Sequence, residues 1–264
     1  MIFDRSNPRV RALTELGASV SRGVLIGLAM LAVAAPFSSR FRTDTDHPPP
    51  LLTATSTPSI VSVGIRLAEF NGLPSSEDIR KLADWISYSH DNGNAGFVVI
   101  DKKQARAYVF DADARLLGSS PVLLGAARGD DSVPGIGSRP LSQVTLGERT
   151  TPAGRFIAER GRNSRGEDVV WVDYDAAISM HRVRTTDPKE RRLERLATQT
   201  SDDKRISYGC INVPVAFYEA FVSPTFASQR AVVYVLPEIE PVQQMFGSHD
   251  VPTASSRRLQ PSYL

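Results

Sequence analysis

The chain has 264 residues, enough for one substantial domain with additional segments. Its 41% hydrophobic and 23% charged residues are ordinary for a globular protein, which excludes a wholly disordered chain. The formal net charge of +2 gives no general signal for nucleic-acid binding, so we expect no nucleic-acid partner.

The first 35 residues have the layout of an export signal. Four arginines precede the apolar run 23–35, which is too short for a comfortable membrane span. Ala32-Val33-Ala34 fits an Ala-x-Ala cleavage site, and an uncleaved N-terminal anchor is the alternative. A buried amphipathic helix fits less well because the run has no polar face. We therefore predict a signal peptide or membrane anchor over 1–35 and an exported protein, with membrane contact only through an uncleaved N-terminal segment.

Residues 36–92 combine a linker with a short helical preface. The first part, 36–59, is rich in proline, serine and threonine, and such a composition buries little surface. In the second part, Ser76 is a candidate helix N-cap. Apolar residues at helical spacing follow it and predict a stripe that packs against a core, namely Ile79, Leu82, Ala83 and Ile86.

From residue 93 the pattern changes to short β-like runs separated by turns rich in glycine, proline and aspartate. These runs are 97–100, 107–110, 121–124, 156–158, 169–172 and 231–236. They predict a mainly β domain over 93–237, largely antiparallel and built from two packed sheets, followed by a flexible tail over 238–264. Asp130-Asp131 lies in a loop-like stretch without further ligands at metal spacing, so we expect an exposed loop and no metal site.

The single cysteine, Cys210, is either a small buried apolar residue or a reactive thiol. In an exported protein a free thiol is a liability, which favours a chemical use. Gly209 permits a sharp turn and close approach of a substrate. The N–H groups of Tyr208, Gly209 and Cys210 are candidate donors to an oxyanion. His181, at the end of the alternating run 171–180, is a candidate base for the thiol.

These residues also carry a family resemblance. His181 followed by Ser207-x-Gly209-Cys210-Ile211-Asn212 resembles the active-site signature of the L,D-transpeptidase (YkuD) catalytic domain family. Thr151-Pro152-x-Gly154-x-Phe156 resembles the upstream turn of that family. The resemblance covers about residues 95–237, and several separated motifs in the right order make it more specific than any one alone. It implies an L,D-transpeptidase-like β-sandwich with short helices.

The resemblance implies an enzyme of cell-wall biogenesis and cell shape. Its Cys210 would attack the bond between meso-diaminopimelate and D-Ala in a peptidoglycan tetrapeptide stem, and an amine of a second stem would resolve the thioacyl-enzyme. Water, a D-amino acid or a protein lysine are alternative acceptors, and water would make it an L,D-carboxypeptidase. The residues alone indicate only a cysteine acyl transferase or hydrolase. The expected partners are donor and acceptor stems, the location is the periplasm or cell envelope, and we expect a monomer without metal or organic cofactor.

The resemblance also implies a role for each site residue. His181 would take the thiol proton, and a backbone carbonyl beside it, from Arg182 or its neighbour, would orient the ring. The remaining residues form a nucleophile and oxyanion loop, Ser207, Tyr208 and Gly209, and a substrate-binding pair, Asn212 and Arg182.

Two positions depart from the pattern of many relatives, which carry His where this chain has Tyr208 and Gly where it has Arg182. Tyrosine keeps a hydrogen-bonding tip but cannot act as a base at neutral pH. These changes keep open a non-catalytic cell-wall-binding module and a cysteine peptidase of another class. The retained Cys, His and Gly argue against the former, and the Thr-Pro-x-Gly-x-Phe turn argues against the latter.

The spacer between His181 and Ser207 is longer than in many relatives. Within it, Asp187 as N-cap and Pro188 at the first helical position predict a helix over 187–197 with one apolar side. Both a solvated surface helix and a lid over the substrate cleft fit this pattern.

Overall fold

The structure is a computed structural model that describes residues 65–252. The predicted signal or anchor over 1–35, the linker over 36–59 and the last residues of the chain lie outside the described residues. The described residues belong to one compact unit, Val61–Leu264. No helix in this part of the chain has the length and apolar character needed to span a bilayer.

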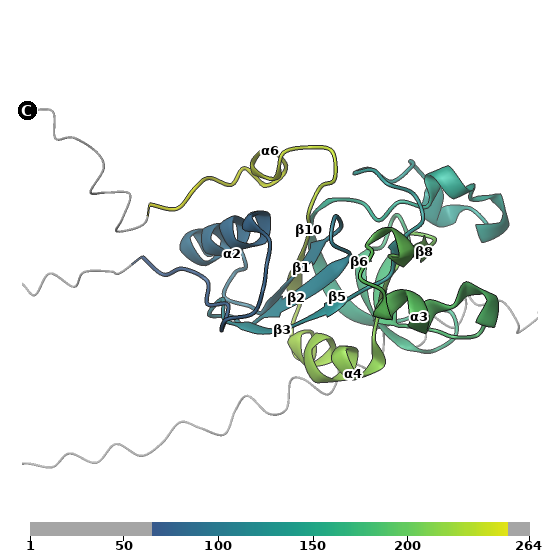
Figure 1. Ribbon diagram of the computed structural model, residues 1–264, viewed down its shortest axis with the longest axis horizontal. Helices are drawn as coiled ribbons and strands as arrows, with labels where there is room; N and C mark the ends of the chain where they lie inside the picture. Colours follow the sequence, from purple (N-terminus) through teal and green to yellow (C-terminus); the bar gives the residue numbers. More distant parts are fainter. Residues whose placement is uncertain (1–64, 253–264) are drawn as a thin grey trace, which may run out of the picture. The chain divides into compact units, whose positions relative to one another are not determined.

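Eight strands in the described residues form one mixed sheet in the order β3-β2-β1-β10-β5-β6-β7-β9 (Figure 1). Two short strands, β4 and β8, pair in parallel as a second sheet. The strand bounds are β1 Phe97–Asp101, β2 Arg106–Phe110, β3 Leu116–Pro121, β4 Leu124–Gly125, β5 Gly154–Arg162, β6 Asp168–Asp173, β7 Ile178–Arg182, β8 Arg205–Ser207, β9 Ile211–Val213 and β10 Ala231–Val235. The predicted mainly β fold with short helices is confirmed.

One face of the large sheet carries a single core that extends from β2 to β9. One hydrophobic cluster joins Val98 and Val109, from β1 and β2, to Met180 and Ile211, from β7 and β9. The intervening strands contribute Val233, Ala158 and Val170 to the same cluster, so one continuous core runs along this face of the sheet. The helical segment 215–225, made of α4 Val215–Phe217, η6 Tyr218–Val222 and α5 Ser223–Thr225, packs onto this cluster.

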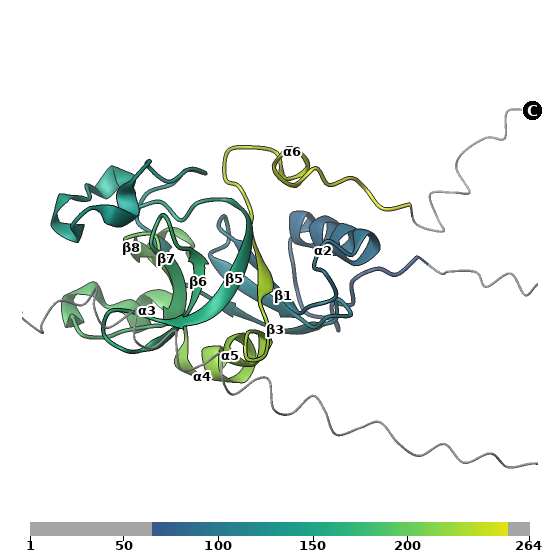
Figure 2. The same ribbon diagram turned by 180° about the vertical axis from the view of Figure 1, so that it is seen from behind.

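Strands β1 and β10 are buried on both faces along their whole length. A strand covered on both faces has no exposed side for polar residues, which explains the continuous apolar runs in these two strands. The second face packs against α2 Glu77–Ser89, whose predicted stripe is fully buried. Figures 1 and 2 show α2 and α4 on opposite sides of the sheet.

The helix α2 begins as the sequence predicts, since the Ser76 hydroxyl accepts a hydrogen bond from the Ile79 N–H. The same hydroxyl donates to Asp101 at the end of β1, at 3.0 Å. Helix α2 therefore packs on the β domain as part of its core.

The chain remains ordered beyond residue 238, where we expected a flexible tail. The helix α6 Val242–Phe246 packs two side chains, Val242 and Phe246, against the α2 side of the core. The N–H groups of residues 238–240 donate to the Asp130 carboxylate. The expectation fails for 238–252 because these polar residues find partners far away in the sequence.

Candidate active site

The predicted base lies on β7, and the predicted nucleophile lies directly before the neighbouring parallel strand β9. In the β7–β9 pair, His181 is opposite Asn212, and Cys210 directly precedes β9. Alternate residues of a strand share a face, which places Ser179 and His181 beside Cys210 and Asn212. All four line one cavity of about 410 Å³.

The strand that carries His181 is shorter than the alternating run 171–180 suggested. Residues 174–177 form a turn between β6 and β7, with Ala177 in the left-handed region at φ 56°. The alternation therefore spans two strands of a hairpin, and His181 lies near the end of the second strand.

His181 is oriented by a backbone carbonyl. Its Nδ1 lies 2.8 Å from the Arg182 carbonyl oxygen. Because a carbonyl only accepts, Nδ1 carries the proton, which leaves the Nε2 lone pair free. Burial lowers the pKa of His181, and Arg184 and Arg192 add to this effect against the opposing Arg182 hydrogen bond and Glu167. The imidazole is therefore neutral near pH 7 and suited to accept a proton.

The Cys210 thiol is half-buried at the cavity wall. Its Sγ lies 3.7 Å from the Ser179 hydroxyl and donates to the Ala177 carbonyl at 3.6 Å. Ser179 is not among the site residues that the sequence predicted. Its position two residues before His181 on one strand is the signal that places it on the same face.

Two hydroxyl groups brace the loop before Cys210. The Ser207 hydroxyl donates to the Cys210 carbonyl at 2.6 Å and accepts the Gly209 N–H at 3.1 Å. The Thr151 hydroxyl donates to the Gly209 carbonyl at 2.7 Å and accepts the Gly125 N–H at 2.9 Å. The Thr-Pro turn and the cysteine motif, which lie far apart in sequence, therefore meet directly.

Gly209 is required by both its backbone and its surroundings. Its φ of +121° lies in a region that L-residues rarely adopt. An added Cβ would lie 2.6 Å from the Ile178 side chain and 2.7 Å from the Thr150 carbonyl oxygen. Since its N–H donates to Ser207, this group is not free for an oxyanion. The expected set of three donors is thereby reduced to Tyr208 and Cys210.

Tyr208 forms part of the cavity wall through its ring. The Arg149 guanidinium carbon lies 3.7 Å from the Tyr208 ring centroid, a cation–π contact. The ring lines the cavity and is partly exposed. This stacking fits an aromatic wall for the cavity.

Asn212 links the nucleophile loop to the long spacer. Its Nδ2 donates to the Cys210 carbonyl at 3.2 Å, and its Oδ1 accepts from Arg192 at 2.5 Å. Arg192 is itself paired with Glu190 at 2.6 Å.

The Arg182 side chain does not line the cavity around Cys210. Its guanidinium pairs with Asp168 at 3.0 Å and Glu219 at 2.5 Å, and stacks over Tyr218. Adjacent residues of a strand face opposite ways, so Arg182 points away from the side that His181 occupies. The geometry assigns the Arg182 carbonyl to the site and not its side chain, in place of the expected substrate-binding role.

The spacer forms one wall of the cavity through Asp187, Glu190 and Arg192. It is not the single helix that we predicted. The 3₁₀ helix η4 Pro188–Glu190 and the α-helix α3 Arg192–Ala197 are separated by Arg191 at φ 50°. Asp187 caps the first turn as expected, accepting from the Lys189 N–H at 2.9 Å. Leu196 in α3 packs with Leu123 and Val183 and anchors the segment to the domain.

Arginines are frequent around the cavity. Those that line it are Arg139, Arg165, Arg184 and Arg192. Within residues 65–252, no group of three or more histidine, cysteine, aspartate or glutamate side chains is arranged to hold a metal ion.

The chain was compared with protein-family models, curated proteins and solved structures. No protein-family model matches the chain, and no curated protein matches it. Among the solved structures that match is the L,D-transpeptidase LdtMt1 in complex with imipenem, with 17% sequence identity and a TM-score of 0.31. The match covers 54% of this chain and 59% of that chain, so it spans less than two thirds of the neighbour. At this TM-score the likeness supports no functional inference.

Proposed function

We propose that this protein is an L,D-transpeptidase, a cysteine-dependent acyl transferase that acts on peptidoglycan stem peptides. One observation carries the proposal. His181 in β7 and Cys210, directly before the neighbouring parallel strand β9, line the same cavity, and the His181 Nδ1 is held by a backbone carbonyl. A cysteine beside a histidine that a third group orients is the general arrangement of an activated thiol nucleophile. The sequence motifs around both residues supply the choice of substrate.

In the first step, the His181 Nε2 accepts the proton of the Cys210 thiol. The thiolate attacks the carbonyl carbon between diaminopimelate and D-Ala, and the resulting oxyanion is stabilised by the N–H groups of Tyr208 and Cys210. The carbon–nitrogen bond then breaks, and D-Ala leaves after taking the proton from the His181 imidazolium. A thioester on Cys210 remains.

In the second step, an amine of another stem attacks the thioester. His181 accepts a proton from this amine and returns it to the sulfur as the carbon–sulfur bond breaks. A new amide bond forms and the thiol is restored. Water in place of the amine would release a tripeptide stem, which is the hydrolytic alternative.

The charges around the cavity support a substrate with carboxylates. Four arginines and two carboxylates, Asp187 and Glu190, line it. Three of the arginines pair with glutamates, which hold the guanidinium groups in place and offset part of their charge. Fixed guanidinium groups recognise carboxylates through paired hydrogen bonds. Peptide stems that end in D-Ala offer such carboxylates.

The proposal extends to location and partners. An export signal or anchor over 1–35 would bring the domain to the periplasm or cell envelope, where peptidoglycan is found. Donor and acceptor stems would then be its partners, and the protein would act as a monomer.

The test is incubation of the purified protein with disaccharide-tetrapeptide, followed by mass spectrometry of the products. A cross-linked dimer that has lost one D-Ala, absent with Cys210→Ala, is the expected result. Release of D-Ala with only tripeptide product would replace the transferase with a carboxypeptidase. Binding without any product would favour a wall-binding module and overturn the enzymatic proposal.

A further inference from the structure

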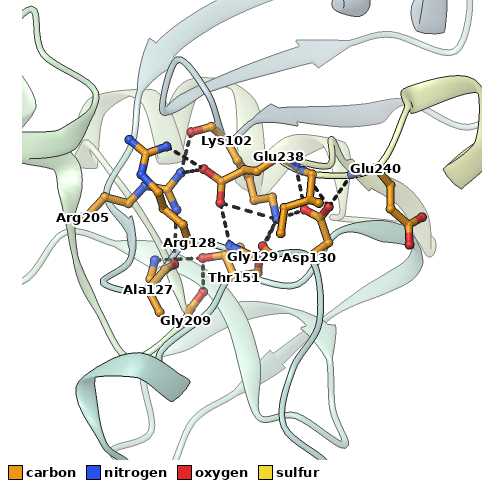
Figure 3. A network of polar contacts seen from close by, with 12 residues as sticks. Lys102, Ala127, Arg128, Gly129, Asp130, Thr151, Arg205, Gly209, Glu238 and Glu240 are labelled. Carbon is orange, nitrogen blue, oxygen red and sulfur yellow. Dashed lines mark hydrogen bonds and ion pairs between the residues drawn. The ribbon is translucent and has the colours of Figure 1, made fainter.

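A buried ionic cluster lies next to the nucleophile loop (Figure 3). It consists of Lys102, Asp130, Arg205 and Glu238, with side-chain exposures of 0%, 4%, 7% and 5%. Lys102 pairs with Asp130 at 2.9 Å, and Arg205 pairs with Glu238. Asp130 was expected in an exposed loop, and its burial in this cluster corrects that expectation.

The Lys102 ammonium has a hydrogen-bond acceptor for each of its three N–H groups. The three N–H groups of the Lys102 ammonium reach Asp130 and the carbonyl oxygens of Gly129, at 2.5 Å, and Thr151, at 3.1 Å. Burial lowers the pKa of Lys102, and Asp130 and Glu238 oppose this change. Burial alone would raise the pKa of Asp130, but backbone N–H groups and Lys102 bring it to about 2. The Asp130 carboxylate is therefore ionised at neutral pH.

Lys102 is connected to both ends of the nucleophile loop. At one end, the Lys102 carbonyl accepts from Arg205 at 2.8 Å, and Arg205 begins β8, which runs into Ser207. At the other end, the Lys102 ammonium holds the Thr151 carbonyl, and the Thr151 hydroxyl holds the Gly209 carbonyl. Gly209 is bonded directly to Cys210.

The cluster is separate from the cavity, because none of its four side chains lines the cavity around Cys210. We propose that Lys102 is a positioning residue, whose ammonium fixes the loop 207–210 through the Thr151 carbonyl; the bond from Arg205 goes to the Lys102 backbone carbonyl and remains when the side chain is replaced. The link from loop position to transpeptidation rests on the proposed function, but the effect on the Cys210 thiol does not.

The experiment compares Lys102→Met with a control, Arg155→Met. Arg155 makes a partly exposed ion pair with Asp91, at 2.6 Å, and its guanidinium faces the Tyr234 ring. For both variants and the original protein, three quantities are measured: the melting temperature, the rate of Cys210 alkylation by iodoacetamide at fixed pH, and kcat and KM on disaccharide-tetrapeptide.

For Lys102→Met we expect an alkylation rate at least roughly tenfold lower and a similar loss in kcat with little change in KM, since a small displacement of a reacting group is costly. Arg155→Met should keep the alkylation rate within about twofold, because the Arg155 side chain contacts Asp91 and Tyr234 and takes no part in the Lys102–Thr151–Gly209 chain of bonds. Equal alkylation rates in Lys102→Met and the original protein would overturn the inference, as would equal losses in both variants.

If Lys102→Met does not fold, the double variant Lys102→Met with Asp130→Asn replaces it. This pair leaves no unmatched buried charge in the Lys102–Asp130 contact, yet the bond to the Thr151 carbonyl is still lost. The same slower alkylation is expected, and a rate equal to that of the original protein would again overturn the inference. If the original protein turns over no stem peptide, but alkylation of Cys210 is still slower in the Lys102 variant, the proposed function is refuted and the positioning role of Lys102 stands.

Discussion

Replacing Gly209 with alanine tests whether the tight turn before Cys210 is needed for the chemistry. The added Cβ would lie 2.7 Å from the Thr150 carbonyl oxygen, a backbone atom that cannot swing aside as a side chain can. It would also lie 2.6 Å from Ile178 Cδ1. The residue must keep φ near +121° to let Thr151 and Ser207 hold the loop.

The loss of unfolding free energy in Gly209→Ala has two contributions. Alanine at positive φ costs about 1–2 kcal/mol relative to glycine. Relieving the contacts in a packed site adds about 1–3 kcal/mol. The sum, about 2–5 kcal/mol, is a large part of the stability of an ordinary domain but does not exceed it. The loop is therefore expected to shift, and acylation of Cys210 should slow by about a hundredfold.

A matched control, Gly72→Ala, separates the cost of backbone strain from the cost of the steric contacts around Gly209. Gly72 has φ +74°, and a Cβ there would meet nothing within 4 Å. Gly72→Ala should lose only about 1–2 kcal/mol of unfolding free energy and keep its acylation rate. Urea unfolding and the rate of acylation by a β-lactam measure both effects. If Gly209→Ala matched Gly72→Ala in stability and kept its acylation rate, the described packing around Cys210 would be refuted.

Three further predictions concern the cavity. His181→Gln should slow acylation by at least about a hundredfold, the scale for losing a general base, and an unchanged rate in a folded variant would show that another base acts. Because burial lowers the pKa of His181, the acylation rate should hold as pH falls through about 6.5 and drop only below it. Arg184→Gln removes a charge that lowers the pKa of His181, so the drop in acylation rate should move to higher pH in this variant. An unchanged pH dependence of the rate would contradict the assignment of His181 as the base. Tyr208→Phe should keep the acylation rate within about threefold, because the stack with Arg149 uses the face of the ring. Tyr208→Ala should lower the rate by more than that, because it removes the ring. A large loss of rate in Tyr208→Phe, measured by the same assay, would show that the hydroxyl has a role.

Local features of the fold could be predicted from the sequence. Ser76 and the apolar spacing after it predicted the capped helix α2, because capping and helical periodicity act within a few residues. The apolar runs 97–100 and 231–236 predicted β1 and β10 for a similar reason. The proposed nucleophile and base could be selected because one thiol and one strand-end histidine lie in distinctive motifs.

Long-range partners could not be predicted in this way. Asp130 accepts from the Glu238 N–H across 108 residues, and no local pattern marks a contact of that kind. A polar stretch therefore suggested an exposed loop and a flexible tail where the structure places a buried ion cluster. The break at Arg191 was missed for another reason, since arginine is a good helix former and its left-handed backbone depends on the surrounding packing.

The central claim is that Cys210 forms the acyl-enzyme. The most direct measurement is the intact mass of the protein after incubation with a carbapenem, whose strained carbonyl would trap the thiolate as a stable thioester. A single adduct on the original protein, located on Cys210 by peptide mapping and absent from Cys210→Ala, is the predicted result. An adduct that persists in Cys210→Ala, or the absence of any adduct on a folded protein whose thiol reacts with iodoacetamide, would contradict it.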